Sequence, residues 1–423
     1  MRQQSYLDAH GDDGYSVLRY DLHLDYRPGA NRLGGRAVIT AVARSALNSV
    51  SLDFGPLRVD RILFDGKAVR YAHRLGKLRV RPGRVLAVGE EFTVEVRYAG
   101  VPRPNRGHWG EIGWTQLSDG ALVASQPTGA SSWFPCNDRP ADKAAYRISV
   151  TTAPSYTVIA SGTLVSHTGS TWVYEQPEPT SPYLVSVQIG RYVSAELAKA
   201  PVRQPAAVPA RLLRAFRNDF ANQPRMLKEF SRLFGPYPFT EYGVVVVDEE
   251  LDVPVEAQAM SIFGSNHVDG RRGSERLVAH ELAHQWFGNS VTASDWRHIW
   301  LHEGFATYAE WLWAEADGRS CHALAQRSHA KLSLLPQDLT LSAPGVRRIF
   351  DDRVYERGAL TLHALRMAMG DGAFFRLLRE WTTAHRHSTA TTPDFVSLAE
   401  AHSAVDVRPL LGVWLDEAPL PPL

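Results

Sequence analysis

The chain has 423 residues, which is long enough for two or three domains and too long for one small core. Hydrophobic residues make up 44% of the sequence and charged residues 22%, the balance of an ordinary globular protein. With 46 basic and 45 acidic residues the formal net charge is +1, so no charge imbalance points to nucleic acid or to an anionic membrane.

The sequence shows neither a membrane span nor a secretion signal. It contains no run of about eighteen apolar residues, and residues 1–10 lack an apolar core of signal-peptide length. We therefore expect a cytoplasmic protein that does not contact a membrane. Cys136 and Cys321 are far apart and form no Cys-x-x-Cys pair, which favours two free thiols. Nothing in the sequence indicates the oligomeric state.

Alternation of apolar and polar residues dominates the chain from about residue 15 to residue 195. The apolar residues of the first such segment are expected on one strand face: Leu18, Tyr20, Leu22, Leu24 and Tyr26. The stretches 92–98 and 183–189 alternate in the same way, and Gly and Pro clusters separate the segments. We predict an N-terminal antiparallel β-domain of twisted, saddle-like sheets over residues 1–197.

The pattern changes after residues 196–210, whose three prolines favour a linker. Apolar residues between 212 and 234 then recur every three or four positions, which predicts helices. A buried strand is expected at 242–248, and an extended stretch at 252–263 suits a sheet edge because of Pro254. Residues from 276 onward favour helices. The sequence therefore predicts an α+β fold whose second domain, residues 198–423, is mainly helical with a small mixed sheet.

The segment His280-Glu281-Leu282-Ala283-His284 lies in one of these helical patterns. Four residues are slightly more than one helical turn, so His280 and His284 project from the same face. Two neutral imidazoles at this spacing can share one metal ion, usually zinc. Glu281 is expected at the rim of that face, where it takes a proton from water at the metal and does not bind the metal itself. Gly288 can end the helix.

A catalytic zinc keeps three protein ligands, so one more is required. Glu303 follows His284 by nineteen positions, which leaves room for a connection and the first turn of a neighbouring helix. His280, His284 and Glu303 therefore form a predicted site for one Zn²⁺, with the donor set of thermolysin-type enzymes. The alternative is a chance motif on a solvated helix face. The apolar residues around the motif argue against it, because unpartnered buried histidines are costly.

Longer stretches around these ligands resemble the aminopeptidase N family of zinc metallopeptidases, the gluzincin aminopeptidases. The similar stretches are Phe-Gly-Asn-Ser-Val-Thr at 287–292, Trp-Leu-His-Glu-Gly-Phe-Ala at 300–306, Phe-Gly-Pro-Tyr-Pro-Phe at 234–239, and Phe-Pro-Cys-Asn-Asp-Arg-Pro at 134–140 with Lys143. The resemblance implies a thermolysin-like catalytic domain in a short two-domain form. Larger members add a β-domain and a helical domain that closes the cavity. This sequence has neither, so we expect a more open cleft.

The resemblance implies three further site residues. The family's Gly-Ala-Met-Glu-Asn segment binds the substrate's α-amino group through its Glu, and positions 253–257 here retain only Glu256. Gln126 falls where the N-terminal domain of the family contributes a second amine-binding group, since an amide oxygen can accept from an ammonium. Tyr355 matches the tyrosine that donates a hydrogen bond to the oxyanion. The ordinary alternatives are an edge-strand carboxylate, a loop glutamine and a packed tyrosine.

The sequence as a whole predicts a zinc-dependent aminopeptidase that removes residues from peptides with a free N-terminus by attack of metal-activated water. Glu281 would act as the general base and Tyr355 would stabilise the oxyanion. An endopeptidase with the same chemistry, or a catalytically silent scaffold that binds proteins, stays open as an alternative. Asp252 favours a basic first residue. His302 is expected to point away from the metal, and the other histidines are read as surface or packing residues.

Overall fold

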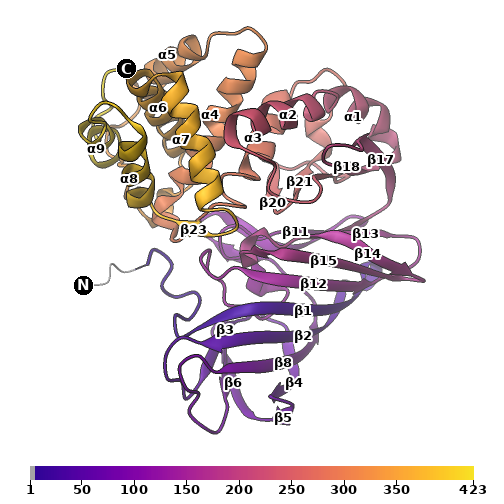
Figure 1. Ribbon diagram of the computed structural model, residues 1–423. Coiled ribbons are helices and arrows are strands. Elements are labelled where there is room, and N and C mark those ends of the chain that lie inside the picture. The colour runs from indigo at the N-terminus through magenta and orange to yellow at the C-terminus, as the bar shows by residue number, and fades with distance from the viewer. Residues whose placement is uncertain (1–4) are drawn as a thin grey trace.

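The first half of the chain folds into three sheets around a shared apolar core, in a computed structural model that describes residues 5–423 (Figure 1). The largest sheet has eight strands, in the order β14 (Thr163–Thr168), β15 (Thr171–Thr180), β12 (Ala144–Thr151), β1 (Tyr15–Arg27), β2 (Arg32–Ala43), β8 (Glu91–Gly100), β4 (Arg58–Phe64) and β5 (Lys67–Ala68). A five-stranded sheet follows the order β13 (Thr157–Ala160), β16 (Val187–Gly190), β11 (Gly120–Ala124), β10 (Gly110–Leu117) and β9 (Asn105–Gly107). The third sheet contains β3 (Val50–Asp53), β7 (Lys77–Arg81) and β6 (Arg70–Arg74).

Neighbouring strands in these sheets are antiparallel except for β1 and β12, which run parallel within the described residues. The predicted alternation of β1 holds for Tyr20 through Tyr26, which are buried at every second position. Leu18 was predicted on the same face, and this is wrong because its side chain is 42% exposed. A bulge between Val17 and Arg19 inserts one residue into the ladder with β2, which turns Leu18 to the opposite face.

The second half combines nine helices with a mixed sheet in the part of the chain that the structure describes. The helices are α1 (Leu213–Asp219), α2 (Gln223–Phe234), α3 (Glu275–His284), α4 (Trp300–Ala316), α5 (Cys321–Leu332), α6 (Asp352–Met369), α7 (Asp371–Ala384), α8 (Thr392–His402) and α9 (Arg408–Asp416). The sheet follows the order β17 (Tyr192–Ala198), β18 (Gln204–Pro209), β19 (Gly243–Val246), β21 (Met260–Phe263) and β20 (Val255–Ala257), with two parallel and two antiparallel pairs. The α+β fold class is thus confirmed.

The predicted linker at 196–210 is wrong, because β17 and β18 pair there and form one side of the mixed sheet. Pro205 and Pro209 lie near the ends of β18, on either side of Ala206 and Ala207, the residues that pair with β19. Prolines at strand ends remove no donor from this ladder. The division of domains at 197/198 stays a prediction, and β17 crosses that position.

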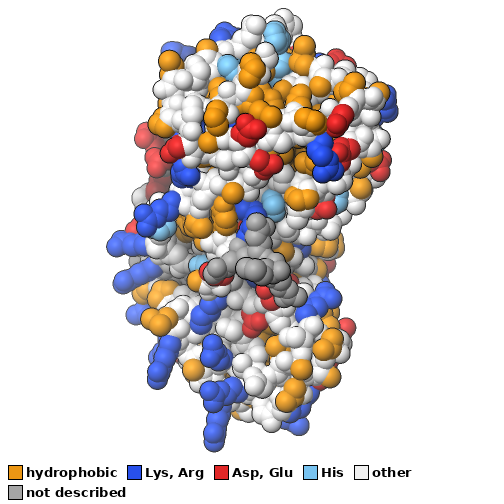
Figure 2. All heavy atoms as spheres, turned by 90° about the vertical axis from the view of Figure 1, so that its left-hand side faces the viewer, with side chains coloured by type: hydrophobic (Ala, Val, Ile, Leu, Met, Phe, Trp, Pro, Cys, Tyr) orange, Lys and Arg blue, Asp and Glu red, His pale blue; other side chains and the backbone are white. Residues whose placement is uncertain are grey.

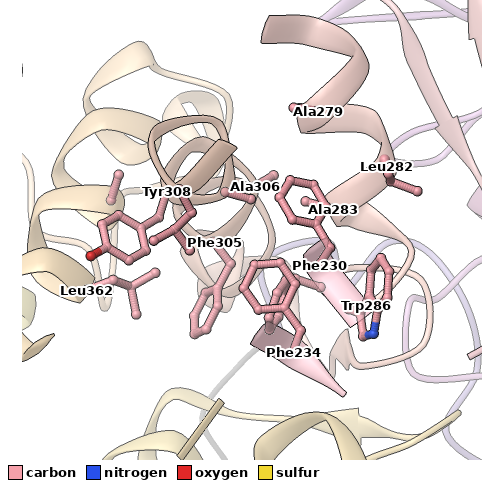
Figure 3. Close-up of a cluster of buried hydrophobic side chains, with 14 of the residues drawn as sticks. Phe230, Phe234, Ala279, Leu282, Ala283, Trp286, Phe305, Ala306, Tyr308 and Leu362 are labelled. Atoms are coloured by element: carbon pink, nitrogen blue, oxygen red, sulfur yellow. The ribbon is translucent and has the colours of Figure 1, made fainter. Parts of the chain in front are cut away.

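Aromatic packing fixes the two helices that carry the predicted ligands (Figure 3). Trp286, two residues after the end of α3, packs edge to face on Phe230 and Phe234 of α2, and α4 adds Phe305 to the same cluster. The indole of Trp286 also donates to the Gly235 carbonyl at 3.0 Å, which ties the segment after α3 to the end of α2. Burial of such large side chains, at about 25 cal/mol per Å² of apolar surface, makes this junction rigid.

Apolar contacts also join the two halves of the molecule. A small cluster brings Leu117 and Leu122 of β10 and β11 against Val245, Ala257 and Ile262 of the mixed sheet. Strand β20, which carries Glu256, is therefore supported by the β-domain. The face shown in Figure 2 carries acidic and basic side chains in both halves. Within residues 5–423, no helix is both long and apolar enough to span a membrane.

Candidate active site

The two histidines of the motif lie one above the other on α3, because four residues separate them along the helix. His280 and His284 are both buried, and their rings meet edge to face with centroids 4.8 Å apart. Helix α3 ends at His284, earlier than the Gly288 that the sequence suggested. The chain continues through tight turns to Gly288, whose φ of +122° lies in the region that favours glycine.

Helix α4 runs beside α3 and places Glu303 against both histidines. Its Oε2 lies 3.5 Å from His280 Nε2 and 3.4 Å from His284 Nε2. Ligand atoms about 2.05 Å from one tetrahedral centre are separated by roughly 3.3 Å, so these distances suit a single zinc ion. The three side chains predicted as ligands are thus brought together with their donor atoms converging.

The remaining ring nitrogens have partners that turn both Nε2 atoms toward Glu303. His280 Nδ1 lies 2.8 Å from Glu310 Oε1, and His284 Nδ1 lies 3.1 Å from the Phe287 carbonyl oxygen. Arg276 in turn donates to both oxygens of Glu310 at 2.9 Å. Such partners fix the tautomer and orientation of metal-binding imidazoles. Glu310 was not among the predicted site residues, although it follows Glu303 by seven residues, two turns along the same helix face.

We expect Glu310→Gln to raise the zinc dissociation constant about tenfold, because the negative charge that favours the metal-binding form of His280 is lost. Competition with a chromophoric chelator would measure this. Glu315→Gln is the matched control, because Glu315 also lies on α4 and also pairs with an arginine, Arg366, but the structure gives it no contact with either histidine. Equal zinc affinities for the two variants would contradict the role given to Glu310.

Burial and nearby carboxylates have opposite effects on the pKa values of the two histidines. Burial opposes charge on His280, but hydrogen bonds to Glu303 and Glu310 outweigh it and raise its pKa well above the ordinary value. For His284, burial is outweighed by Glu303 and Glu256, which raise the pKa to about 9. Burial disfavours the charge of Glu303, but the imidazoles hold its pKa far below the usual range. The centre therefore attracts positive charge, from protons or from a metal cation.

Glu281 occupies a different part of the centre from the three ligand candidates. Its side chain is buried, and among the described residues its Oε2 has no hydrogen-bond partner. Burial, the largest influence, raises its pKa to about 7. The carboxylate oxygens of Glu281 and Glu256 and a ring nitrogen of His284 all lie within 4.8 Å of one another. An unpartnered carboxylate oxygen of raised pKa beside a metal site is suited to exchange a proton with water.

Glu256 reaches the centre from β20, the edge strand of the mixed sheet, as the position of Pro254 suggested. It is half-buried, and removal from water raises the pKa of its carboxyl above the ordinary value. Its carboxylate lies within 4.8 Å of ligand atoms of Glu281 and His284, so an acceptor for a cationic group is close to the proposed metal ligands. Val253 and Asp252 precede it on an exposed loop. The preference that Asp252 would give for a basic first residue stays a prediction.

Tyr355 lies in the first turn of α6, with its ring parallel to that of His280 at a centroid distance of 6.2 Å. Burial, followed by the charges of Glu303, Glu256 and Glu281, raises its pKa well above 10, so the phenol keeps its proton. A close approach of α4 and α6 makes this position possible. A Cβ on Gly304 would lie 2.7 Å from the Gly358 Cα, so these two helices meet backbone to backbone beside Glu303.

The structure leaves the predicted role of Gln126 as a prediction. The residue follows β11 and is half-buried, and among the described residues its amide nitrogen has no hydrogen-bond partner. His302 points away from the ligands, as expected: burial lowers its pKa to about 3, and the neutral ring accepts a hydrogen bond from the Ala293 N–H at 2.7 Å. Both cysteines are free thiols.

Both halves of the chain match models of one peptidase family. Residues 219–414 match the Peptidase family M1 domain, and residues 16–184 match the Peptidase M1 N-terminal domain. Among curated proteins, the chain is 24% identical to Aminopeptidase M1 of Arabidopsis thaliana, over 91% of this chain and 47% of that protein. It is 26% identical to Probable aminopeptidase 1 of Sulfurisphaera tokodaii, over 96% of this chain and 53% of that protein. The chain thus spans about half the length of these relatives.

A solved structure matches almost end to end. It is the M1 zinc metallopeptidase of Deinococcus radiodurans, 33% identical with a TM-score of 0.90, covering 99% of this chain and 98% of that one. A mutant of the same protein, 32% identical with a TM-score of 0.90 over 98% and 97% of the two chains, was solved with a Tyr-Ser-Ala substrate. Both domain matches, and a relative of this similarity along nearly its whole length, establish that the chain belongs to the M1 family of zinc metallopeptidases.

Proposed function

We propose that this chain is a zinc aminopeptidase in which His280, His284 and Glu303 hold the metal. The observation that carries the proposal is the position of Glu256, whose carboxylate lies within 4.8 Å of ligand atoms of Glu281 and His284. A carboxylate at this distance can hold an ammonium so that the first peptide bond, and no later one, lies at the metal. The names of the curated relatives and the tripeptide substrate of the Deinococcus enzyme support a peptide substrate with a free N-terminus.

Zinc, when bound, would polarise the scissile carbonyl and acidify a water molecule. Glu281 takes the proton of the attacking water at its unpartnered Oε2 and later gives it to the leaving nitrogen. Tyr355, which keeps its proton because its pKa is raised, donates a hydrogen bond to the oxyanion of the tetrahedral intermediate. Glu256 holds the substrate ammonium during both proton transfers, and Gln126 is proposed as a second acceptor for it.

The endopeptidase alternative has the same metal ligands and differs only in the need for a free amine. A silent scaffold would retain the fold without turnover, and the presence of Glu281 and Tyr355 beside the ligands favours a working enzyme over it. Both alternatives can be separated from the proposal by one substrate series.

The test is hydrolysis of a panel of aminoacyl-arylamides beside their N-acetylated counterparts, with and without a zinc chelator. We expect cleavage of the free-amine series only, loss of activity with chelator and its return with zinc. Glu256→Gln is expected to raise KM for the free-amine series at least tenfold, because an amide cannot pair ionically with the ammonium. Equal cleavage of the acetylated series would indicate an endopeptidase, and no cleavage by zinc-loaded protein would favour the scaffold.

A further inference from the structure

A short turn after α3 contacts the three elements that carry the proposed zinc ligands and Glu256. Residues 285–292, named here the post-ligand turn, supply the Phe287 carbonyl that accepts from His284 Nδ1. The side chain of Asn289 donates to the carbonyl of Ala257, the residue that follows Glu256, at 2.9 Å. Directly after the turn, the Ala293 N–H donates to His302, the neighbour of Glu303. A displacement of this turn would therefore disturb α3, β20 and α4 together.

A lysine from the other half of the molecule donates hydrogen bonds to the carbonyls of this turn. Lys143 directly precedes β12 of the β-domain, and its Nζ donates to the carbonyl oxygens of Asn289 and Ser290, both at 2.9 Å, and to Thr292 Oγ1 at 3.0 Å. The carbonyl of Ser388, which precedes the short strand β23 (Thr389–Ala390), lies 3.4 Å from the same nitrogen. These acceptors are fixed by the fold, and three of them belong to one four-residue segment, residues 289–292.

The lysine is unusual because no described residue forms an ion pair with it. Burial lowers the pKa of Lys143 to about 7, because an ammonium that is removed from water and contacts only neutral oxygens is less stable than one in solvent. The β-domain adds a second contact to the same turn, since the hydroxyl of Tyr183 donates to the Gly288 carbonyl at 3.2 Å. Two side chains of the β-domain thus satisfy carbonyl groups that α3 and its turn leave without helical partners.

We propose that Lys143 is a positioning residue for the zinc centre: it holds the post-ligand turn so that the Phe287 carbonyl keeps His284 oriented toward the metal. The lysine does not touch the metal or the substrate, and it acts through the turn. The β-domain then contributes to metal affinity as well as to substrate binding. This inference depends on the zinc site and not on which peptides are cleaved.

Zinc affinity tests the proposal without an activity assay. The dissociation constant is measured on metal-free protein by competition with a chromophoric chelator, for wild type, Lys143→Met and Lys143→Gln. We expect Lys143→Met to raise it about tenfold or more, in the range found when hydrogen-bond partners of metal-binding histidines are altered. Lys143→Gln, which keeps two N–H donors without charge, should show a smaller rise.

Lys77→Met is the matched control. Lys77 also lies in the β-domain and pairs with the buried Asp53 at 2.6 Å, so its loss weakens that domain without touching the turn. Its zinc affinity should stay within threefold of wild type. A folded Lys143→Met protein with unchanged zinc affinity would overturn the proposal, and so would an equal loss in Lys77→Met.

A second variant covers the case in which Lys143→Met does not fold. Tyr183→Phe removes the hydroxyl that donates to the Gly288 carbonyl of the post-ligand turn, and it leaves the packing of the ring on Trp296 in place. We expect a zinc dissociation constant about threefold higher than in wild type, and an unchanged value would then overturn the proposal. Failure of the aminopeptidase assay would leave these metal-affinity results unaffected, so the two outcomes can be told apart.

Discussion

Replacement of Glu281 by Gln is expected to lower kcat on the order of 10³-fold while zinc stays bound. The amide keeps the shape of the side chain but cannot accept the proton of the attacking water, and general-base catalysis typically contributes 10²- to 10⁴-fold. Steady-state kinetics on a free-amine arylamide would measure the loss. Metal analysis of the same preparation should find zinc in the amount bound by wild type, because the proposed ligand set, in which both histidine Nε2 atoms converge on Glu303 Oε2, does not include Glu281.

Residual activity of Glu281→Gln near that of wild type would remove this residue from the reaction. Loss of zinc together with activity would mean that Glu281 supports the metal instead of moving a proton. Among the described residues, Oε2 of Glu281 has no hydrogen-bond partner, which argues for a role in proton transfer. A carboxylate that served only to orient a ligand would have its oxygens hydrogen-bonded within the protein.

Tyr355→Phe is expected to lower kcat by about 10²-fold with KM changed less than threefold. The hydroxyl would bond the oxyanion and not the ground-state carbonyl, and removal of one such donor typically costs about 3 to 4 kcal/mol of transition-state stabilisation. The phenyl ring remains parallel to His280, so the zinc centre should be unchanged.

Tyr308→Phe provides the control for this experiment. Tyr308 is a buried tyrosine of α4 whose hydroxyl contacts His363 at 3.3 Å, away from the ligands, and the same chemical change should leave kcat near wild type. If Tyr355→Phe raised KM and left kcat unchanged, the tyrosine would bind substrate without acting on the transition state.

Periodicity was sufficient to predict the parts of the centre that depend on one helix. His280 and His284 share a face because of the helical repeat, and Glu303 was placed by its distance along the chain. Glu310 and Lys143 were assigned no role because theirs depend on how two elements pack. The first acts across the α3–α4 contact and the second across the junction of the two halves. Glu303 also acts across the α3–α4 contact, but the need for a third zinc ligand pointed to it, and no such requirement pointed to Glu310 or Lys143.

The errors in the fold have equally local causes. The bulge that exposes Leu18 is a single inserted residue, and alternation of apolar residues is the same with or without it. The prolines of residues 196–210 suggested a linker because proline usually ends strands, but those in β18 lie where few backbone donors are needed. In both cases the outcome depended on how the strand pairs with its neighbours, which the side-chain pattern does not encode.

A series of contacts runs from Arg276 at the protein surface to the proposed metal ligands in the interior. Arg276 has a side chain that is 65% exposed, whereas Glu310, its partner, is 5% exposed and His280 is 10% exposed. Dissolved ions that compete for the guanidinium therefore act on a carboxylate that orients a ligand inside the protein. An exposed side chain thus sets the charge environment of a carboxylate that orients His280 in the interior, so the polarity of the surface at residue 276 is coupled to the geometry of the centre.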